Sequence, residues 1–266
     1  MLNTVEEKIN KVKDILKRFN RVVVAFSGGI DSTLVLALAL KTCKHVIAAT
    51  VYLPYIPLRH INRAKLIASE LKVKHIIINE PKLPDEILYN PPNRCYLCKK
   101  KMIKLIKNTT NTDIIIDGTN ADDYKEYRPG LKALEEENVV SPLALAGMTK
   151  NDIKYSLKIL GLDKWDAPPT TCLLTRIPYG DLVTYSRLKK IEKAEEIIIN
   201  TTSIKHVRVR DHGDLARIEV PKEKFEILLN PLVSSTIVSE LKKLGYRFIT
   251  LDLEGYKRSS APVSLE

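Results

Sequence analysis

The sequence predicts an α/β protein in which a doubly wound parallel sheet is followed by a smaller α+β domain. Apolar, β-branched runs alternate with helical patterns through the first part of the chain, as in parallel strands joined by crossover helices. After about residue 180 the pattern changes to a helix, a hairpin and two further helices. Its 266 residues allow one large domain or two smaller ones, and 44% hydrophobic side chains can bury a sizeable core.

Four strands with helices between them are expected in the first domain, residues 1–180. The strands are expected at 21–26, 46–51, 75–79 and 113–118, and the helices at 33–42, 60–71, 97–107 and 149–160. Residues 161–183 are rich in proline, including Pro168 and Pro169, and they lack a helical period. Such a long segment predicts a functional loop or a linker.

The second domain, residues 181–258, is expected to be a small α+β unit. Its predicted elements are a helix at 185–199, a hairpin of 204–210 with 215–220 that turns at 211–214, helices at 222–229 and 231–244, and a strand at 246–252. The last residues, 259–266, are expected to be a disordered tail.

Composition limits the partners that the chain can have. The net charge of +11 fits an anionic partner such as a nucleotide or tRNA, or a general lysine bias. Basic clusters at 99–107 and 189–193 have no interleaved aromatic residues, so nucleic-acid binding is not favoured. No apolar run reaches about 18 residues, the length a membrane helix needs, and residues 1–19 are unlike a secretory signal. We therefore expect a cytoplasmic protein without a membrane partner.

The Gly-rich turn after the first strand is the strongest functional signal. Ser27, Gly28, Gly29, Asp31 and Ser32 stand between an apolar strand and an apolar helix that is expected to start near residue 33. Glycines allow the backbone N–H groups to approach a phosphate closely, and the first turn of the helix adds unpaired N–H groups. No lysine follows the glycines, so this is not a Walker P-loop.

The four cysteines fall into two kinds. Cys43 lies in an apolar helical segment and is expected to be a core residue. Cys95 and Cys98 form a C-x-x-C pair just before a predicted helix, and Cys172 lies in the Pro-rich segment. Three thiolates leave a four-cysteine site one ligand short, which suggests a metal or cluster with an open position. A zinc site with an added histidine, a redox dithiol, or no shared site remain alternatives.

Polar residues follow the fourth predicted strand. The stretch 117–123 contains paired acids, Asp122 and Asp123, after a Gly turn. The carboxyl end of such a strand faces the ligand crevice of a doubly wound sheet, although an Asx-capped turn would also explain the pattern. Arg128 is a candidate fork for a phosphate or carboxylate.

The predicted hairpin has two chemically different faces. Its period of two places Arg208 and Arg210 on one face, and Arg217 with Glu219 share a face of the neighbouring strand. If these faces coincide, they form a basic platform suited to phosphate. A solvated sheet face with cross-strand ion pairs is the alternative.

Taken in order, the motifs resemble the LarE family of PP-loop sulfur transferases, whose core is an ATP pyrophosphatase-type, adenine nucleotide alpha hydrolase-like domain. The matching segments are 27–32, 94–99, 117–123, 127–130, 141–143, 165–168, 172–180, 207–210 and 217–219. They span nearly the whole chain. The SGGxDS loop is common to many PP-loop enzymes, whereas the 172–180 block and the ordered series are more specific.

The resemblance implies a reaction. ATP adenylates a pyridinium carboxylate mononucleotide, and sulfur then replaces AMP to give a thiocarboxylate, a precursor of the nickel-pincer nucleotide cofactor of lactate racemase. One branch of the family sacrifices the sulfur of a cysteine at the Cys172 position. The presence of Cys95 and Cys98 favours the branch in which three cysteines hold a [4Fe–4S] cluster that carries sulfide. Family members assemble as homo-oligomers, and the sulfide donor is not implied.

The resemblance also implies roles for individual residues. Ser27, Gly28, Gly29, Asp31 and Ser32 would bind the ATP phosphates, with Mg²⁺ expected to neutralise them. The substrate phosphate would bind Arg208 and Arg210. Cys172, Asp31 and Arg176 are the catalytic candidates, Asp122 and Arg128 are further nucleotide-binding candidates, and Glu196 and Glu219 match metal-binding acids. A further acid of the family falls near Ile227, which makes a second metal site doubtful.

Two rival functions fit part of the pattern. A PP-loop tRNA-thiolating enzyme would share ATP activation and the three cysteines, and the basic charge favours it, but no added RNA-binding module is evident. A non-catalytic iron–sulfur or zinc-binding module that keeps only the nucleotide pocket is the other.

Overall fold

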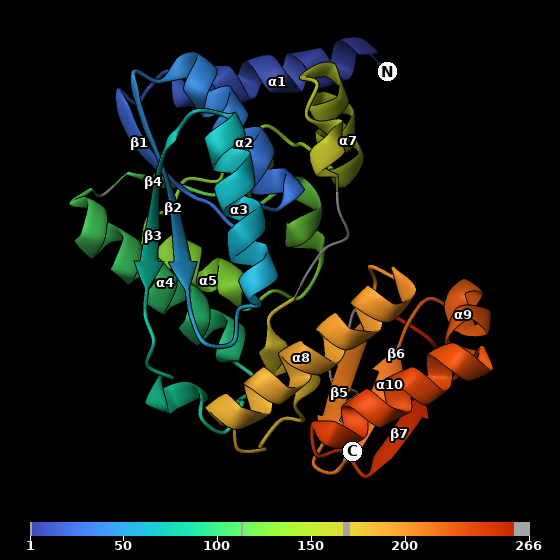
Figure 1. Ribbon diagram of the computed structural model, residues 1–266. Coiled ribbons are helices and arrows are strands. Elements are labelled where there is room, and N and C mark those ends of the chain that lie inside the picture. The colour runs from blue at the N-terminus through green and yellow to red at the C-terminus, as the bar shows by residue number, and fades with distance from the viewer. Residues whose placement is uncertain (1, 113, 167–170, 258–266) are drawn as a thin grey trace. The chain divides into compact units, whose positions relative to one another are not determined.

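A computed structural model describes residues 2–112, 114–166 and 171–257 (Figure 1). The chain divides into two compact units, residues 1–82 with 92–170 and residues 83–91 with 171–266. The boundary expected near residue 180 falls inside the second of these units. Pro168, Pro169 and the tail at 259–266, for which we made predictions, lie outside the described residues.

A four-stranded parallel sheet forms the centre of the first unit. The order is β3-β2-β1-β4, with β1 at Arg21–Ala25, β2 at His45–Tyr52, β3 at Lys74–Asn79 and β4 at Ile115–Ile116. Val23 fixes the register, since it pairs with Ile47 on one side and Ile115 on the other. The chain moves outward from β1 to β3 and returns to the opposite side of β1 as β4. A doubly wound sheet binds its ligand at such a switch point.

The fourth strand is shorter than the sequence predicts. Only Ile115 and Ile116 pair with β1, whereas a strand was expected over 113–118. The reason is that the next backbone N–H, that of Asp117, donates to the carbonyl of Val140 at 3.0 Å. The chain therefore leaves the sheet edge where the polar residues begin.

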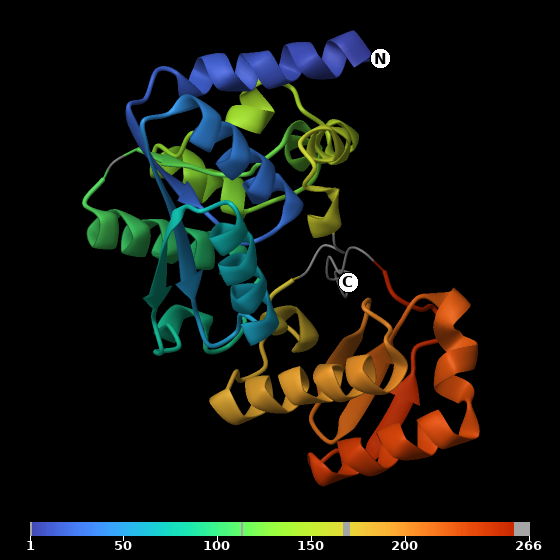
Figure 2. The ribbon, with the colours of Figure 1, turned by 45° about the horizontal axis from the view of Figure 1, so that its top comes forward.

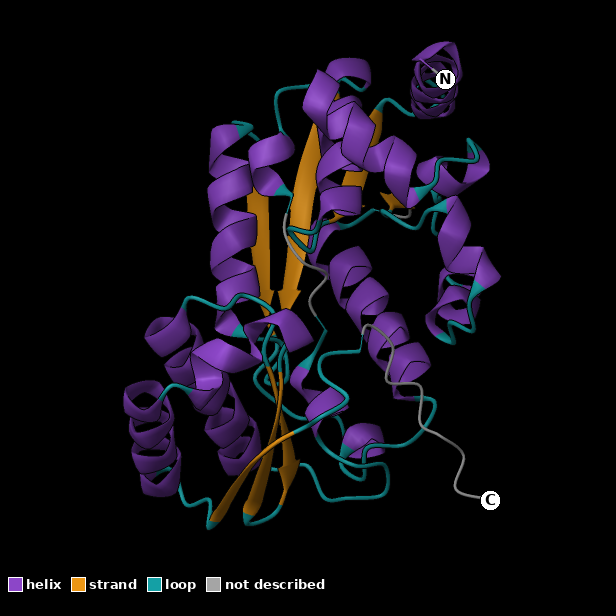
Figure 3. Ribbon diagram, turned by 90° about the vertical axis from the view of Figure 1, so that its right-hand side faces the viewer, coloured by secondary structure: helices purple, strands orange, loops and turns teal. Residues whose placement is uncertain are grey.

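Helices cover both faces of this sheet (Figure 3). The helices of the first unit are α1 Leu2–Leu16, α2 Ile30–Thr42, α3 Leu58–Glu70, α4 Arg94–Thr110, α5 Gly130–Glu136, α6 Pro142–Leu145 and α7 Lys150–Ile159, with 3₁₀ turns at Ala121–Lys125 and Asp163–Trp165. Helix α2 is apolar around its whole circumference because α1, α6 and α7 pack on its side away from the sheet. Its residues from Ser32 to Ala39 are all buried.

Helices α2 and α4 begin three residues earlier than expected, and α3 begins at Leu58 instead of residue 60. The first N–H to C=O bond of α2, from Thr33 to Gly29, places Asp31 and Ser32 in its first turn rather than in the loop. Helix α4 begins at Arg94 because the N–H of Leu97 already donates to the Asn93 carbonyl. Cys95 and Cys98 therefore lie within the first turns of α4, not before the helix.

The second unit is a three-stranded sheet with two long helices. Its strands are β5 Arg208–His212, β6 Leu215–Glu219 and β7 Phe248–Leu251, in the order β5-β6-β7, with β5 antiparallel and β7 parallel to β6. The helices are α8 Tyr185–Thr202, α9 Phe225–Leu229 and α10 Pro231–Lys243, with 3₁₀ turns at Asp85–Ile87, Leu173–Arg176 and Lys222–Lys224. Helices α8 and α10 lie side by side (Figure 2).

The hairpin of the second unit is tighter than predicted. Strand β5 continues to His212, so the turn consists of Gly213 and Asp214 alone instead of 211–214. Gly213 supplies the positive φ of 80° that a two-residue turn needs. The register pairs Arg208 with Glu219 and Arg210 with Arg217, so the polar faces of the two strands do coincide.

A short segment that precedes the C-x-x-C pair in the sequence belongs to the second unit. The buried side chain of Asn90 donates to three carbonyls of the 172–180 region, those of Leu174, Ile177 and Pro178, at 3.1, 2.7 and 3.1 Å. The N–H of Val183 donates to the carbonyl of Leu88 at 2.7 Å. Within the described residues, no helix is both long and apolar enough to cross a membrane.

The apolar α2 is expected to carry much of the stability of the first unit. Leu36 has no exposed surface, whereas Leu66 on α3 is 61% exposed. We expect Leu36→Ala to lower the free energy of unfolding by about 2–5 kcal/mol because it leaves a cavity. The matched control Leu66→Ala is expected to change it by less than about 0.5 kcal/mol. Urea unfolding of the two variants checks this, and equal losses would contradict the assignment of the core.

Candidate functional site

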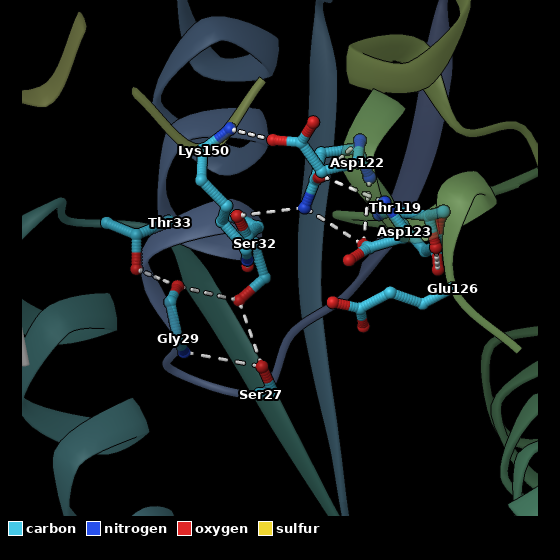
Figure 4. A network of polar contacts seen from close by, with 12 residues as sticks. Ser27, Gly29, Ser32, Thr33, Thr119, Asp122, Asp123, Glu126 and Lys150 are labelled. Atoms are coloured by element: carbon cyan, nitrogen blue, oxygen red, sulfur yellow. Dashed lines mark hydrogen bonds and ion pairs between the residues drawn. The ribbon is translucent and has the colours of Figure 1, made fainter. Parts of the chain in front are cut away.

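The Gly-rich loop joins β1 to α2 at the switch point of the sheet. Gly28 takes the left-handed conformation, with a φ of 73°, and Gly29 is the N-cap of α2, which no side chain caps. The Ser27 hydroxyl accepts from the Gly29 N–H at 3.3 Å and lies 3.2 Å from the Ser32 hydroxyl (Figure 4). The positive end of the helix is thus presented by bare backbone, as an anion site requires.

Two glycines allow neighbouring segments to approach this loop. A Cβ on Gly28 would lie 3.0 Å from the backbone nitrogen of Ala64 in α3. One on Gly118, which follows β4, would lie 2.6 Å from the backbone nitrogen of Ser32. Only glycine fits at Gly118, and this contact brings the polar stretch 117–123 against the start of α2.

Asp31 lies in an ion pair that the sequence did not indicate. Its Oδ2 is 2.5 Å from Nζ of Lys150, the first residue of α7, and Nδ2 of Asn120 lies 3.4 Å from its Oδ1. Burial raises the pKa of Asp31, and Lys150 opposes that shift. A lysine beside the Gly-rich loop therefore comes from a distant helix instead of from the loop itself.

Asp122 and Asp123 have different partners. Asp122 accepts from the backbone N–H of Lys150 at 2.9 Å and from Nζ of Lys125 at 2.9 Å. These two hydrogen bonds lower its pKa. Asp123 completes a capping box with Asn120, so the Asx-capped turn is present within the site. Figure 4 shows both acids in one network with Ser32 and Lys150.

The candidate fork Arg128 is held by carboxylates of its own segment. It is 2.9 Å from Asp123 and 3.0 Å from Glu126. Its side chain is 45% exposed, so a phosphate could reach it only in competition with these two acids.

The cysteines are divided between the two units. Cys95 is exposed and Cys98 half-buried, and their spacing of three residues places them on one face of α4. The hydroxyl of Tyr55, which is fully buried, donates to Sγ of Cys98 at 3.3 Å. Cys172 is the N-cap of a 3₁₀ turn in the second unit. Among the described residues no group of three or more His, Cys, Asp or Glu side chains is placed to hold a metal ion.

Cys43 is the half-buried C-cap of α2. It lies against the main hydrophobic cluster of the first unit, and its Sγ is 3.5 Å from the carbonyl oxygen of Leu16. Burial raises the pKa of its thiol.

The arginines of the second unit form a buried cluster and not a solvated face. Arg176, Arg208 and Arg210 are 3%, 2% and 8% exposed. Arg210 makes a two-pronged ion pair with Glu219 at 2.7 and 3.0 Å, and it also donates to the carbonyl of Thr175. Arg176 makes a similar pair with Glu195 at 2.7 and 3.3 Å. Arg208 donates to neutral acceptors, the Lys257 carbonyl and the Tyr256 hydroxyl.

The two predicted metal-binding acids differ in burial. Glu196 on α8 is exposed, and Glu219 is buried against Arg210. The acid of α8 that enters the cluster is Glu195. The sequence indicates that Glu195 is buried, because it falls on the same helix face as the buried residues Leu188, Ile191 and Ile198.

Sequence reasoning missed four further residues near these groups. They are Asn120, Lys150, Tyr55 and Tyr256. Lys150 begins a helix after a capping threonine, which predicts a helix start and carries no functional signal. The other three approach their partners through the tertiary fold alone.

The close approach at Gly118 should be intolerant of any side chain. We expect Gly118→Ala to cost about 1–3 kcal/mol of unfolding free energy through overpacking, and to weaken ATP binding because α2 must shift. Gly130→Ala is the matched control, because its Cβ would meet nothing nearer than 3.6 Å. Urea unfolding and calorimetric ATP titration measure both effects, and an unchanged ATP affinity in Gly118→Ala would contradict the role of this contact.

The burial of Asp31 predicts a pH-dependent cost. Folding raises the pKa of Asp31 above its ordinary value of 3.8, so the protonated carboxyl stabilises the folded state. This stabilisation is lost as the pH rises above 3.8 and the carboxyl ionises. In nucleotide-free protein we expect Asp31→Asn to raise the melting temperature at pH 7 and to have a smaller effect below pH 3.8.

Asp122→Asn provides the control of opposite sign, because the pKa of Asp122 is lowered and its ionised form is favoured by the fold. It should lower the melting temperature at pH 7. The same sign for both variants would contradict the electrostatic assignment.

Known proteins resemble this chain along most of its length. The family described as queuosine biosynthesis protein QueC matches residues 21–88, the span from β1 to the 3₁₀ turn at Asp85–Ile87. An uncharacterised protein of Synechocystis sp. is 33% identical over 95% of this chain and 96% of its own length. One of Methanocaldococcus jannaschii is 35% identical over 94% and 98%.

A relative from Lactiplantibacillus plantarum is described by an activity. It is the pyridinium-3,5-bisthiocarboxylic acid mononucleotide synthase, and it is 33% identical to this chain over 91% of the chain and 89% of its own length. The match agrees with the parallel sheet and Gly-rich loop of the first unit, which confirm the predicted PP-loop fold. The chain therefore belongs to the LarE family of PP-loop sulfur transferases.

Proposed function

We propose that this protein is an ATP-dependent sulfur transferase that converts a carboxylate of a pyridinium carboxylate mononucleotide to a thiocarboxylate. The observation that carries the proposal is the bare Gly-rich loop at the switch point of the sheet, in a chain similar over 91% of its length to a bisthiocarboxylate synthase. Two such conversions would give the precursor of the nickel-pincer nucleotide. A cytoplasmic homo-oligomer is part of the proposal.

The first step is adenylation. A carboxylate oxygen of the substrate attacks the α-phosphorus of ATP, the bond from that phosphorus to the bridging oxygen breaks, and pyrophosphate leaves. The backbone N–H groups of the loop and of the first turn of α2 would bind the departing charge. Lys150, which pairs with Asp31, would add a positive charge near the leaving pyrophosphate. Mg²⁺ bound with the ATP would neutralise the phosphates. Asp31 is the carboxylate that lies nearest to the Gly-rich loop along the sequence.

The second step transfers sulfur. A sulfur nucleophile attacks the acyl carbon of the adenylate, the acyl–oxygen bond breaks, and AMP leaves. Cys95, Cys98 and Cys172 would hold a [4Fe–4S] cluster, which when bound would supply sulfide. The donor set suits iron, since all three are unbridged thiols and thiolate is the usual ligand of such clusters. Tyr55 donates a hydrogen bond to Cys98 and would orient that sulfur.

Cys172 alone could also deliver sulfur. Its thiolate would attack the acyl carbon of the adenylate and displace AMP, and loss of the Cys172 α-proton would then break the Cβ–S bond to leave dehydroalanine and the thiocarboxylate. The presence of Cys95 and Cys98 supports the cluster rather than this route.

The arginine cluster of the second unit would bind the substrate phosphate. Arg208 and Arg210 lie on one face of β5, two residues apart, and Arg176 comes from the 3₁₀ turn that follows Cys172. The carboxylates of Glu195 and Glu219 fix the orientation of two of these guanidinium groups, those of Arg176 and Arg210. A preorganised fork loses less entropy when it binds phosphate.

The test is an anaerobic assay with ATP, Mg²⁺, sulfide and pyridinium-3,5-dicarboxylate mononucleotide. We expect wild-type protein to release pyrophosphate and to form thiocarboxylate, measured by mass spectrometry. Cys172→Ala should lose thiocarboxylate formation at least about 100-fold, because the sulfur donor is removed, and should still bind ATP. Cys43→Ala is the matched control and should remain active, since Cys43 packs half-buried against the hydrophobic cluster of the first unit and is not one of the three cysteines of the proposal. Full sulfur transfer by Cys172→Ala would contradict the proposal.

Iron content separates the two sulfur routes. About four irons per chain with matching sulfide, lost in Cys95→Ala, would support the cluster. Absence of iron together with a mass decrease of one H₂S after a single turnover would support sacrifice of Cys172. Tight, salt-sensitive binding of tRNA without pyrophosphate release on the mononucleotide would instead favour the tRNA-thiolating alternative.

A further inference from the structure

The C-terminal turn, residues 252–257, is fixed to the end of β6. The N–H of Asp252 donates to the carbonyl of Ile218 at 2.9 Å, and that of Tyr256 donates to the carbonyl of Val220 at 2.8 Å. Gly255 between them has a φ of 72°, and a Cβ there would lie 2.9 Å from Cγ of Lys222. The turn therefore has one well-defined path, which brings Tyr256 to the arginine cluster.

Tyr256 holds the guanidinium of Arg208 in two ways. The centre of the guanidinium lies 4.5 Å from the centroid of the tyrosine ring, and Nη2 donates to the tyrosine hydroxyl at 3.2 Å. The ring is itself fixed by His206, whose ring meets it edge-on at 5.4 Å. Stacking defines the plane of the fork, and the hydrogen bond defines its rotation within that plane.

The C-terminal turn contacts Arg208 through neutral groups, whereas Arg176 and Arg210 contact charged ones. Arg176 and Arg210 bind glutamate carboxylates, which offset their charge. The Tyr256 hydroxyl and the Lys257 carbonyl, 2.9 Å from Nη1, are neutral. These two contacts orient Arg208 and leave its positive charge intact, as recognition of a phosphate dianion requires.

We propose that Tyr256 is a positioning residue for substrate: it presents Arg208 to the phosphate of the mononucleotide. The inference rests on the proposed function and adds to it a residue outside the arginine motif. The contribution of Tyr256 should therefore depend on both the substrate phosphate and the Arg208 side chain.

The experiment compares the binding of pyridinium-3,5-dicarboxylate mononucleotide with that of its dephosphorylated nucleoside, by calorimetry on the full chain. We expect Tyr256→Ala to weaken mononucleotide binding about tenfold, in keeping with loss of a buried cation–π contact. Tyr256→Phe, which keeps the stacking, should weaken it only about threefold. Nucleoside binding should not change in either variant.

A double-mutant cycle separates positioning from a structural role. In an Arg208→Ala background, Tyr256→Ala should cause no further loss of mononucleotide affinity, because its effect passes through Arg208. Phe248→Ala is the control: its ring is 54% exposed and contacts Arg247, which is not one of the clustered arginines, so affinity should stay at the wild-type level. Melting temperatures identify any variant that fails to fold.

Each other outcome overturns a different statement. Equal losses for mononucleotide and nucleoside, or additive losses with Arg208→Ala, would show that Tyr256 only supports the fold. Wild-type protein that binds the mononucleotide no better than the nucleoside would overturn the proposed phosphate site itself, and with it the role of Tyr256.

Discussion

The contact between Gly118 and the first turn of α2 is the constraint on which the first unit depends. Where β1 and β4 diverge, the loop after β1 must present bare N–H groups, and the segment after β4 must supply polar side chains. The 2.6 Å that a Cβ on Gly118 would leave to the Ser32 nitrogen shows how close these two segments are. Any larger residue would separate the anion site from the acids and from Lys150.

The site is built at some cost to stability. Asp31 is a carboxylate that burial disfavours, and the Lys150 ion pair only partly compensates. The start of α2 has no capping side chain, although such a cap commonly stabilises a helix by about 1 kcal/mol. Both features make sense if a negatively charged ligand, with its metal ion, completes the electrostatics. The apolar α2 behind the loop, buried from Ser32 to Ala39, provides the rigid support.

The second unit is under a different constraint, because it buries three guanidinium groups within a small core. Two are held by glutamates from α8 and β6, and the third is held by an aromatic ring and neutral oxygens. Breaking a buried pair by removing one partner leaves an uncompensated charge and is strongly destabilising. The glutamates and Tyr256 therefore preserve the geometry of the cluster, and their positions are constrained as tightly as those of the arginines.

The sequence by itself determined the order of strands and helices along the chain, the Gly-rich loop and the family, because these depend on local periodicity and on motifs read along the chain. It predicted which side chains share a face of each hairpin strand, since strand alternation fixes that, whereas the register that brings the two polar faces together came from the structure. It placed the starts of α2 and α4 three residues late, because polar and glycine residues at helix starts have no apolar period.

Only the tertiary structure decided which distant side chains meet. Lys150 reaches Asp31 across 119 positions of sequence, and Tyr256 reaches Arg208 across 48. It also showed that Glu195, and not Glu196, enters the arginine cluster. Such contacts depend on how helices and turns pack in three dimensions, and single-sequence periodicity carries no information about that packing beyond the buried face of each element.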